Sequence, residues 1–258
     1  MKKICDKPTI GIVGMGVVGT ALYKMLHYFD YTIWENDKFK DTMYSIEAVR
    51  GCDIIFICLP TPVKNNGTID MSAFDDVFPQ LTGYKGIVVV KSTVLPGTCE
   101  ELSHKYNLDI VSNPEFLTEA NSNMDMMNPH KIVLGGEMRL IEKLLDIYGR
   151  FKCDFIITDK TQTAELIKYA CNCALAMKVS FANEMYDIAE SCGATYEIVK
   201  QGMYADKRIG KFMRVTKERG FGGMCFPKDT SAFYKWSKSK MVKATMDVNK
   251  EVRMTKFK

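Results

Sequence analysis

The sequence predicts an α/β protein in which a Rossmann-like, doubly wound parallel sheet is followed by an all-helical domain. Short apolar runs alternate with helical patterns between residues 9 and 157, which is typical of a parallel sheet with crossover helices. A glycine motif separates the first run from the first helical pattern. From residue 161 to about 189, apolar residues recur at helical spacing without proline or glycine. We therefore expect two domains, at residues 1–158 and 159–258.

The composition is that of a soluble globular protein. Of the 258 residues, 47% are hydrophobic and 26% are charged, and no apolar run approaches the roughly 18 residues of a membrane span. The net charge of +4 is too small to indicate nucleic-acid binding. Asp6, Lys7 and Pro8 interrupt what could otherwise resemble a signal peptide. Nine cysteines without a C-x-x-C spacing indicate reduced thiols in a cytoplasmic protein, and we expect no metal site.

The first apolar run, residues 9–13, leads into the motif Gly14-Met15-Gly16-Val17-Val18-Gly19 and then into a helical pattern. In this context Gly14 permits a tight turn, Gly16 lets a pyrophosphate approach the backbone, and Gly19 allows close helix–strand packing. The helix that follows offers N–H groups to the phosphates. The motif therefore predicts a dinucleotide site.

An acidic residue follows the second predicted strand, residues 31–34. Glu35 lies about 20 residues beyond the first motif glycine, where a carboxylate can accept hydrogen bonds from a ribose diol. A carboxylate there would repel a 2′-phosphate, so the cofactor we expect is NAD rather than NADP. Asp37 is an alternative for this role, and a solvent-exposed strand end without a ligand is the simpler interpretation of Glu35.

Polar residues follow several further predicted strands. The strands are expected at residues 53–59, 86–91, 109–111 and 131–134. Ligands of doubly wound sheets bind at the carboxyl ends of the strands. The polar residues that follow these ends, and which we expect near the chemistry, are Thr61, Ser92, Thr93, Glu115 and Glu119.

A glycine-rich stretch near the C-terminus, residues 220–229, contains a cysteine that is followed closely by Lys228 and Asp229. Glycine lets backbone approach a ligand closely, and a cysteine near a lysine in such a loop can act as a nucleophile. A buried, inert cysteine in a turn is the alternative. The three glycines and the adjacent charges favour thiol chemistry at Cys225.

The long helical pattern at residues 161–189 places Lys168 and Asn172 four residues apart, hence on one face. A solvated lysine is the simpler interpretation of Lys168. A helix of this length can also form the seam of a dimer.

Together the motifs resemble the UDP-glucose/GDP-mannose dehydrogenase family. The resemblance runs from about residue 9 to about residue 253. The motifs that carry it, in family order, are GMGVVG, LPTP, STVLPGT, NPEFLTEA, AELIKYACNCALAMKVSFANE, DKRIG and GFGGMCFPKD.

The resemblance implies an NAD-dependent oxidation of a nucleotide sugar, UDP-glucose to UDP-glucuronate being the expected reaction. Two hydride transfers convert a primary alcohol to a carboxylate, and Cys225 holds the intermediate as a thiohemiacetal and then a thioester. Lys168 and Asn172 would contact the sugar and its oxyanion, and Asp229 would work with Lys168 through water.

The resemblance also implies a set of binding residues. The residues implied in catalysis are Cys225, Lys168, Asn172, Asp229, Glu115 and Thr93. Those implied in cofactor binding are Gly14, Met15, Gly16, Val17, Val18, Gly19, Glu35, Lys40, Thr61, Ser92, Thr93, Glu119 and Lys228. Those implied in substrate binding are Glu115, Phe116, Leu117, Thr118, Lys168, Asn172, Arg208 and Gly222, with Arg208 serving the neighbouring subunit of a homodimer formed through the central helices.

The chain departs from the family pattern in three respects. Ala120 and Met224 replace a glycine and a serine of two motifs. Family members carry a third domain that grips the nucleotide, and this sequence ends about where the helix leading to it is expected. A separate polypeptide could supply that domain. The alternatives are a non-catalytic NAD-binding or regulatory module and a single-step β-hydroxyacid-type dehydrogenase, which would not need Cys225.

Overall fold

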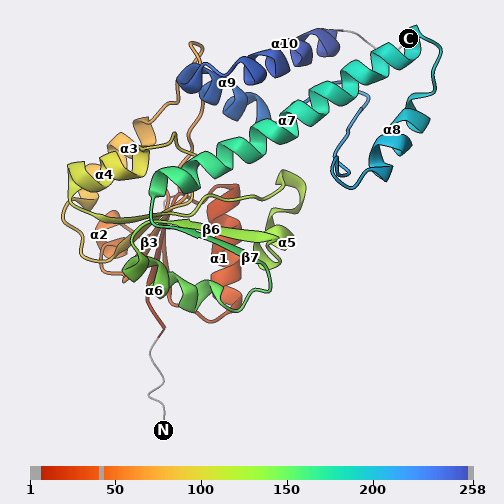
Figure 1. Cartoon of the computed structure of the whole chain (residues 1–258). Coiled ribbons are helices and arrows are strands. Elements are labelled where there is room, and N and C mark those ends of the chain that lie inside the picture. The colour runs from red at the N-terminus through yellow and green to blue at the C-terminus, as the bar shows by residue number, and fades with distance from the viewer. Residues whose placement is uncertain (1–6, 41–43, 255–258) are drawn as a thin grey trace. The chain divides into compact units, whose positions relative to one another are not determined.

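A computed structural model describes residues 7–40 and 44–254, apart from the side chain of Glu119. The chain forms two compact units. Within the described residues, the first unit contains the chain up to Pro62 and Ile69–Lys168, and the second contains Val63–Thr68 and the chain from Tyr169 onward. Figure 1 labels the helices and strands of both units.

The first unit is built on a seven-stranded sheet with the order β2-β1-β3-β4-β5-β6-β7. The strands are β1 (Ile10–Val13), β2 (Ile33–Asn36), β3 (Ile54–Ile57), β4 (Ile87–Val90), β5 (Asp109–Ser112), β6 (Lys131–Gly135) and β7 (Asp154–Thr158). Strand β1 pairs in parallel with β2 on one side and β3 on the other. The strand order therefore reverses direction at β1, and such a switch point is where doubly wound sheets bind their ligands.

Both faces of the sheet are covered, as the near-continuous apolar strands require. Ile54 and Phe56 face a core that includes side chains of α1 (Val17–Tyr28), α5 (Ser122–Met127) and α6 (Met138–Tyr148). Ile55 and Ile57, the alternating residues of the same strand, face a second core. That core includes side chains of α2 (Ile46–Val49), α3 (Ser72–Val77), η1 (Phe78–Leu81) and α4 (Thr98–Tyr106).

The predicted fold class is confirmed, with one correction to the expectation of a parallel sheet. Strand β6 pairs with β5 in antiparallel orientation, through Ser112 and Gly135, and with β7 in parallel. The connection from β5 to β6 contains the short elements η2 (Glu119–Asn121) and α5 rather than a long crossover helix. Parallel neighbours are usually joined by a crossover helix, and the residues between Ser112 and Lys131 contain only these two short elements.

The second unit is helical. It contains the part of α7 (Thr161–Ser191) from Tyr169 onward, α8 (Tyr196–Ala205), α9 (Phe226–Ser237) and α10 (Lys240–Met254). Phe221 packs with Ala176 and Val179 of α7 in a small apolar core. Among the residues that the structure describes, no helix is long and apolar enough to cross a membrane.

One buried carboxylate fixes the start of α4. Glu165 is 2% exposed, and it accepts hydrogen bonds from the N–H groups of Gly97 (2.6 Å) and Cys99 (2.8 Å). Gly97 is the N-cap of α4 and has no side chain with which to cap it. Glu165 therefore satisfies two N–H groups that the helix leaves without an internal partner.

Replacing Glu165 by Ala should lower the free energy of unfolding by about 3 kcal/mol, because two buried N–H groups lose a charged acceptor. Urea unfolding of the variant beside wild type measures this loss. Glu101→Ala is the matched control, since Glu101 is an exposed residue in the first turn of the same helix. Equal unfolding free energies for the two variants would contradict the capping role.

Candidate functional site

The glycine motif forms the turn between β1 and α1. Gly14 has φ +93°, and a Cβ built there would lie 2.6 Å from the carbonyl oxygen of Cys58. A Cβ at Gly19 would collide with the carbonyl oxygen of Gly14. At Gly16, by contrast, a Cβ would meet nothing within 4 Å. Two glycines are thus required by the turn itself, whereas among the residues that the structure describes Gly16 faces open space in which a ligand has room.

The N-terminus of α1 fits an anionic ligand. Gly16 is the N-cap, and no side chain caps the helix there. The first turn contains no acidic residue. Uncapped N–H groups at a helix N-terminus attract phosphate through hydrogen bonding and the helix dipole. Together with the open space at Gly16, this arrangement fits the pyrophosphate of a dinucleotide.

Two residues after β2 hold the glycine loop. Asp37 accepts a hydrogen bond from the N–H of Met15 at 2.8 Å, and Lys40 donates to the carbonyl oxygen of Met15 at 3.1 Å. Glu35 lies inside β2, which ends two residues later than expected, at Asn36. The structure thus connects Asp37 and Lys40 to the loop directly. Asp37 is the residue that the sequence offered as the alternative to Glu35.

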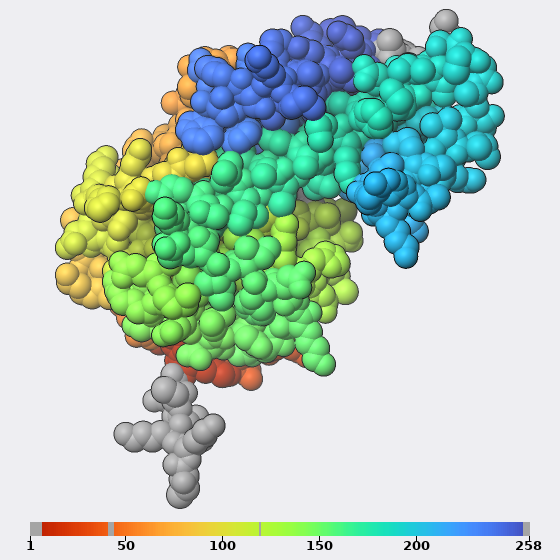
Figure 2. Space-filling view, viewed as in Figure 1, coloured from red at the N-terminus to blue at the C-terminus, as the bar shows by residue number. Residues whose placement is uncertain are grey.

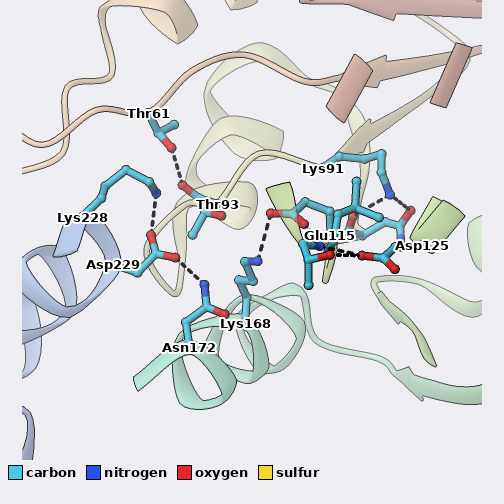
Figure 3. A network of polar contacts seen from close by, with 12 residues as sticks. Thr61, Lys91, Thr93, Glu115, Asp125, Lys168, Asn172, Lys228 and Asp229 are labelled. Carbon is cyan, nitrogen blue, oxygen red and sulfur yellow. Dashed lines mark hydrogen bonds and ion pairs between the residues drawn. The ribbon is translucent and has the colours of Figure 1, made fainter. Parts of the chain in front are cut away.

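The ends of β3 and β4 are joined by hydroxyl groups. Thr61, which is buried, donates to the carbonyl oxygen of Thr93 at 2.8 Å, and Ser92 donates to the carbonyl oxygen of Leu59 at 2.7 Å. Both bonds lie just beyond the carboxyl ends of adjacent strands, in the region predicted from the strand pattern. Figure 3 shows the pair Thr61–Thr93.

Glu115 and Lys168 form a buried ion pair within the first unit. Their side chains are 12% and 4% exposed, and Lys168 Nζ lies 2.9 Å from Glu115 Oε1 (Figure 3). Glu115 Oε2 accepts from the N–H of Leu117 at 2.6 Å, and Lys168 Nζ lies 5.4 Å from the ring centroid of Phe116. Both oxygens of this carboxylate therefore have partners. A pair with these partners has a defined orientation, which a reacting group needs.

Thr118 and Glu119 continue the loop that begins at Glu115. The N–H and hydroxyl groups of Thr118 both donate to Asp125, at 2.7 and 2.6 Å. The side chain of Glu119, predicted to contact the cofactor, lies outside the described part of the structure. The loop from Glu115 to Thr118 is thus held at both ends by carboxylates.

In the second unit, a buried carboxylate lies one turn after the predicted nucleophile. Asp229 is 1% exposed, accepts from Asn172 Nδ2 at 2.5 Å, and pairs with Lys228 (Figure 3). Cys225 is exposed and is the N-cap of α9, and its carbonyl oxygen accepts the N–H of Asp229 at 2.8 Å. The structure therefore brings together Asn172, Lys228 and Asp229, with Cys225 on the adjoining turn.

Two predicted substrate contacts are exposed in the second unit. Arg208 follows α8, its side chain is 89% exposed, and it pairs with Asp206 at 2.6 Å. Gly222, in the loop before Cys225, is also exposed. An arginine side chain this exposed is accessible to another molecule.

A buried lysine at the end of β4 was not among the predicted site residues. Lys91 is 4% exposed and donates to Asn113 Oδ1 at 2.9 Å, which also accepts from the hydroxyl of Tyr148 at 2.7 Å. Burial lowers the pKa of Lys91 to about 8. The nearby Cys58 and Glu115 raise this pKa in part, and the positive charge of Lys168 lowers it further. In the sequence Lys91 only ends an apolar run, so the pattern gave no sign of its burial.

The pKa of Lys91 predicts a stability that rises with pH. In the unfolded chain a lysine has a pKa near 10.4, so between pH ~8 and ~10.4 the unfolded state binds a proton that the folded state does not. The free energy of unfolding of wild type, relative to Lys91→Met, should therefore increase by about 2 kcal/mol from pH 7.5 to 9.5. Denaturant unfolding at both pH values measures this. Lys85→Met is the matched control at an exposed position: it keeps Lys91, so its free energy of unfolding should rise with pH as that of wild type does. Identical pH profiles for all three proteins would contradict the prediction.

Comparison with known proteins identifies both parts of the chain. Residues 31–152 match the NAD binding domain of the UDP-glucose/GDP-mannose dehydrogenase family, and residues 162–253 match the central domain of the same family. The glycine motif lies just before the first matched range. The expected cofactor, NAD, agrees with this match.

Similar proteins include a UDP-glucose 6-dehydrogenase of Bacillus subtilis, 36% identical over 226 residues, which cover 80% of this chain and 48% of the relative. The UDP-glucose 6-dehydrogenase of Rickettsia conorii is 37% identical over 209 residues, with coverage of 77% and 48%. This chain thus spans about half the length of these relatives.

Among solved structures, a UDP-glucose dehydrogenase from the archaeon Pyrobaculum islandicum superposes with a TM-score of 0.86 at 29% identity, covering 97% of this chain and 70% of that one. A GDP-mannose dehydrogenase of Pseudomonas aeruginosa gives a TM-score of 0.69 at 26% identity, covering 94% and 68%. The two matched domains, in this order, show that the chain belongs to the UDP-glucose/GDP-mannose dehydrogenase family.

Proposed function

We propose that this chain carries out the NAD-dependent oxidation of a nucleotide sugar, UDP-glucose to UDP-glucuronate, through a covalent intermediate on Cys225. The observation that carries the proposal is the set formed by an exposed Cys225 at the start of α9, one turn before the buried Asp229 that accepts from Asn172. A single-step dehydrogenase needs no such thiol. The named activities of the relatives at 36% and 37% identity support the choice of UDP-glucose.

The proposed NAD-binding domain comprises residues 1–158, and residues 159–258 form the proposed central domain. When bound, NAD accepts one hydride in each of the two oxidations. Gly16 would lie at its pyrophosphate, and Glu35 at its ribose, with Lys40 nearby. Ser92, Thr93 and Lys228 would make the remaining contacts, together with Thr61 and Glu119.

The first oxidation requires a group that takes the proton of the sugar hydroxyl. Lys168, or a water held by Asp229, would accept that proton. Lys168 is already oriented by Glu115 at 2.9 Å, so it presents its Nζ in a defined direction. The product of this step is an aldehyde, and Asn172 would hold the sugar beside it.

The second oxidation requires the thiol. The sulfur of Cys225 adds to the aldehyde carbon, a C–S bond forms, the carbonyl π bond breaks, and its oxygen becomes an oxyanion that Lys168 and Asn172 stabilise. Loss of hydride from this carbon leaves a thioester. Water, oriented by Glu115, then attacks the carbonyl carbon, the C–S bond breaks, and the thiol recovers a proton as the acid leaves. Covalent capture keeps the reactive aldehyde on the protein.

Replacement of Cys225 by Ser should abolish acid formation, with a loss of about a thousandfold or more, while the first oxidation persists. NADH and UDP-glucuronate are measured together, with UDP-glucose as substrate. Wild type should form two NADH for each sugar oxidised, and the variant should approach one, with free aldehyde detectable by hydroxylamine. No NADH from wild type with any UDP- or GDP-sugar, even with a third-domain polypeptide added, would overturn the proposal in favour of a binding module.

We also propose that the chain forms a homodimer through α7. Met177, Phe181 and Ile188 are 38%, 42% and 50% exposed, and their spacing of four and seven places them on one face. Figure 2 shows atoms of this helix, in teal, at the surface. An apolar helix face that the described residues of the chain leave exposed is suited to a second copy.

Phe181→Glu should shift the chain from dimer to monomer, because a charge would enter the proposed apolar seam. Equilibrium sedimentation at micromolar concentration measures the mass of wild type and variant. Glu190→Lys, exposed on α7 and away from this face, should leave the dimer intact. A wild type that sediments as a monomer would contradict the proposal.

A further inference from the structure

The backbone that leads to Cys225 is held by a residue on α10. Asn249 Oδ1 accepts the N–H of Phe221 at 2.6 Å, and Asn249 Nδ2 donates to the carbonyl oxygen of Phe221 at 3.1 Å. One amide side chain thus pairs with both backbone groups of one loop residue, as a neighbouring strand would. Phe221 lies four residues before Cys225.

A second residue of α10 reaches the same loop. Arg253 lies one turn after Asn249, hence on the same face of the helix, and its Nη1 donates to the carbonyl oxygens of Phe221 (3.2 Å) and Arg219 (3.4 Å). A Cβ at Gly222 would lie 2.9 Å from Arg253 Nη1, and one at Gly220 would collide with Asn249 Oδ1. The loop therefore contains glycine where α10 approaches it most closely.

The start of the loop is anchored on α7. Arg219, 3% exposed, pairs with Asp187 at 2.7 Å, and Asn183 Oδ1 accepts the N–H of Gly220 at 3.1 Å. Phe221 itself is 5% exposed in an apolar core with α7. Fixed points on two helices therefore surround residues 219–221, and only residues 222–224 separate them from the cysteine.

We infer that Asn249 and Arg253 are positioning residues for Cys225, which they place at the start of α9 by fixing the backbone at Phe221. This inference rests on the proposed function of Cys225. Glycine-rich backbone loses much conformational entropy when it is ordered, so external hydrogen bonds are needed to keep such a loop in one conformation. A nucleophile displaced by even 1 Å reacts far more slowly.

The two oxidations depend differently on the position of Cys225. The first transfers a hydride from the alcohol carbon and does not involve sulfur. The second follows only if the thiol adds to the aldehyde, so that a C–S bond forms before the second hydride leaves. Loosening the loop should therefore impair the second oxidation while the first continues. A variant that is merely less stable would lose both in proportion.

The first test needs no substrate and uses the full chain. Hydrogen exchange of the peptide containing residues 219–225 is compared in wild type, Asn249→Ala and Asn249→Asp, with Lys250→Ala as the matched control at the next, exposed position of α10. Asn249→Ala should accelerate exchange of this peptide at least tenfold, and Asn249→Asp less, since its carboxylate still accepts the Phe221 N–H. Lys250→Ala should match wild type. Unaltered exchange in Asn249→Ala would overturn the inference.

The second test measures NADH and UDP-glucuronate from UDP-glucose, with urea midpoints to establish that each variant is folded. Asn249→Ala should lower the ratio of NADH to sugar from two toward one and release aldehyde that hydroxylamine traps, and Asn249→Asp should recover part of the ratio. A ratio of two with reduced rate would overturn the positioning role. If wild type forms no NADH, the proposed function fails, and the exchange experiment still decides whether α10 holds the loop.

Discussion

The polar arrangement of the second unit depends on one buried carboxylate. Asp229 is 1% exposed, and an uncompensated charge at such a position would destabilise the fold by about 3–5 kcal/mol. Asn172 and Lys228 compensate this charge. Because Asn172 belongs to α7, its hydrogen bond to Asp229 holds α9 to α7, and loss of that bond would destabilise the fold. Cys225 begins the same helix, and its position follows from that of Asp229. In the first unit, the buried charges of Glu115 and Lys168 compensate each other in the same way.

Most of the first unit could be predicted from the sequence because its determinants are local. Apolar runs of strand length, separated by helical patterns, specify strands covered on both faces, and the glycines at 14 and 19 are required by the turn that contains them. The direction of β6 could not be predicted, since its apolar pattern is the same in either orientation. The end of β2 lies two residues beyond the predicted one, and the sequence left Glu35 and Asp37 as alternatives there. The hydrogen bond from the Met15 N–H to Asp37 is a tertiary contact that the local pattern does not specify.

In the candidate site, too, some residues could be predicted from the sequence and others could not. Its motif residues stand out because glycine, cysteine and charge occur together within ten positions, and a family resemblance assigns them expected roles. The groups that support them do not stand out. Lys91, which follows β4, donates to Asn113, which follows β5, and Asn249 pairs with Phe221 across 28 positions. Neither pairing produces a local sequence pattern. Supporting residues of this kind are determined by tertiary packing, which periodicity does not encode.

The antiparallel junction between β5 and β6 has a consequence for how the sheet opens. Strands β6 and β7 pair with each other along five residues, but β6 meets β5 through Ser112 and Gly135, supplemented by the bond from Asn113 Nδ2 to the Val133 carbonyl oxygen. The segment β6–α6–β7 is therefore attached mainly by the apolar side chains of β6 and α6 rather than by a ladder. Such a segment can separate as one cooperative unit while the five-stranded remainder, with its glycine turn, stays folded.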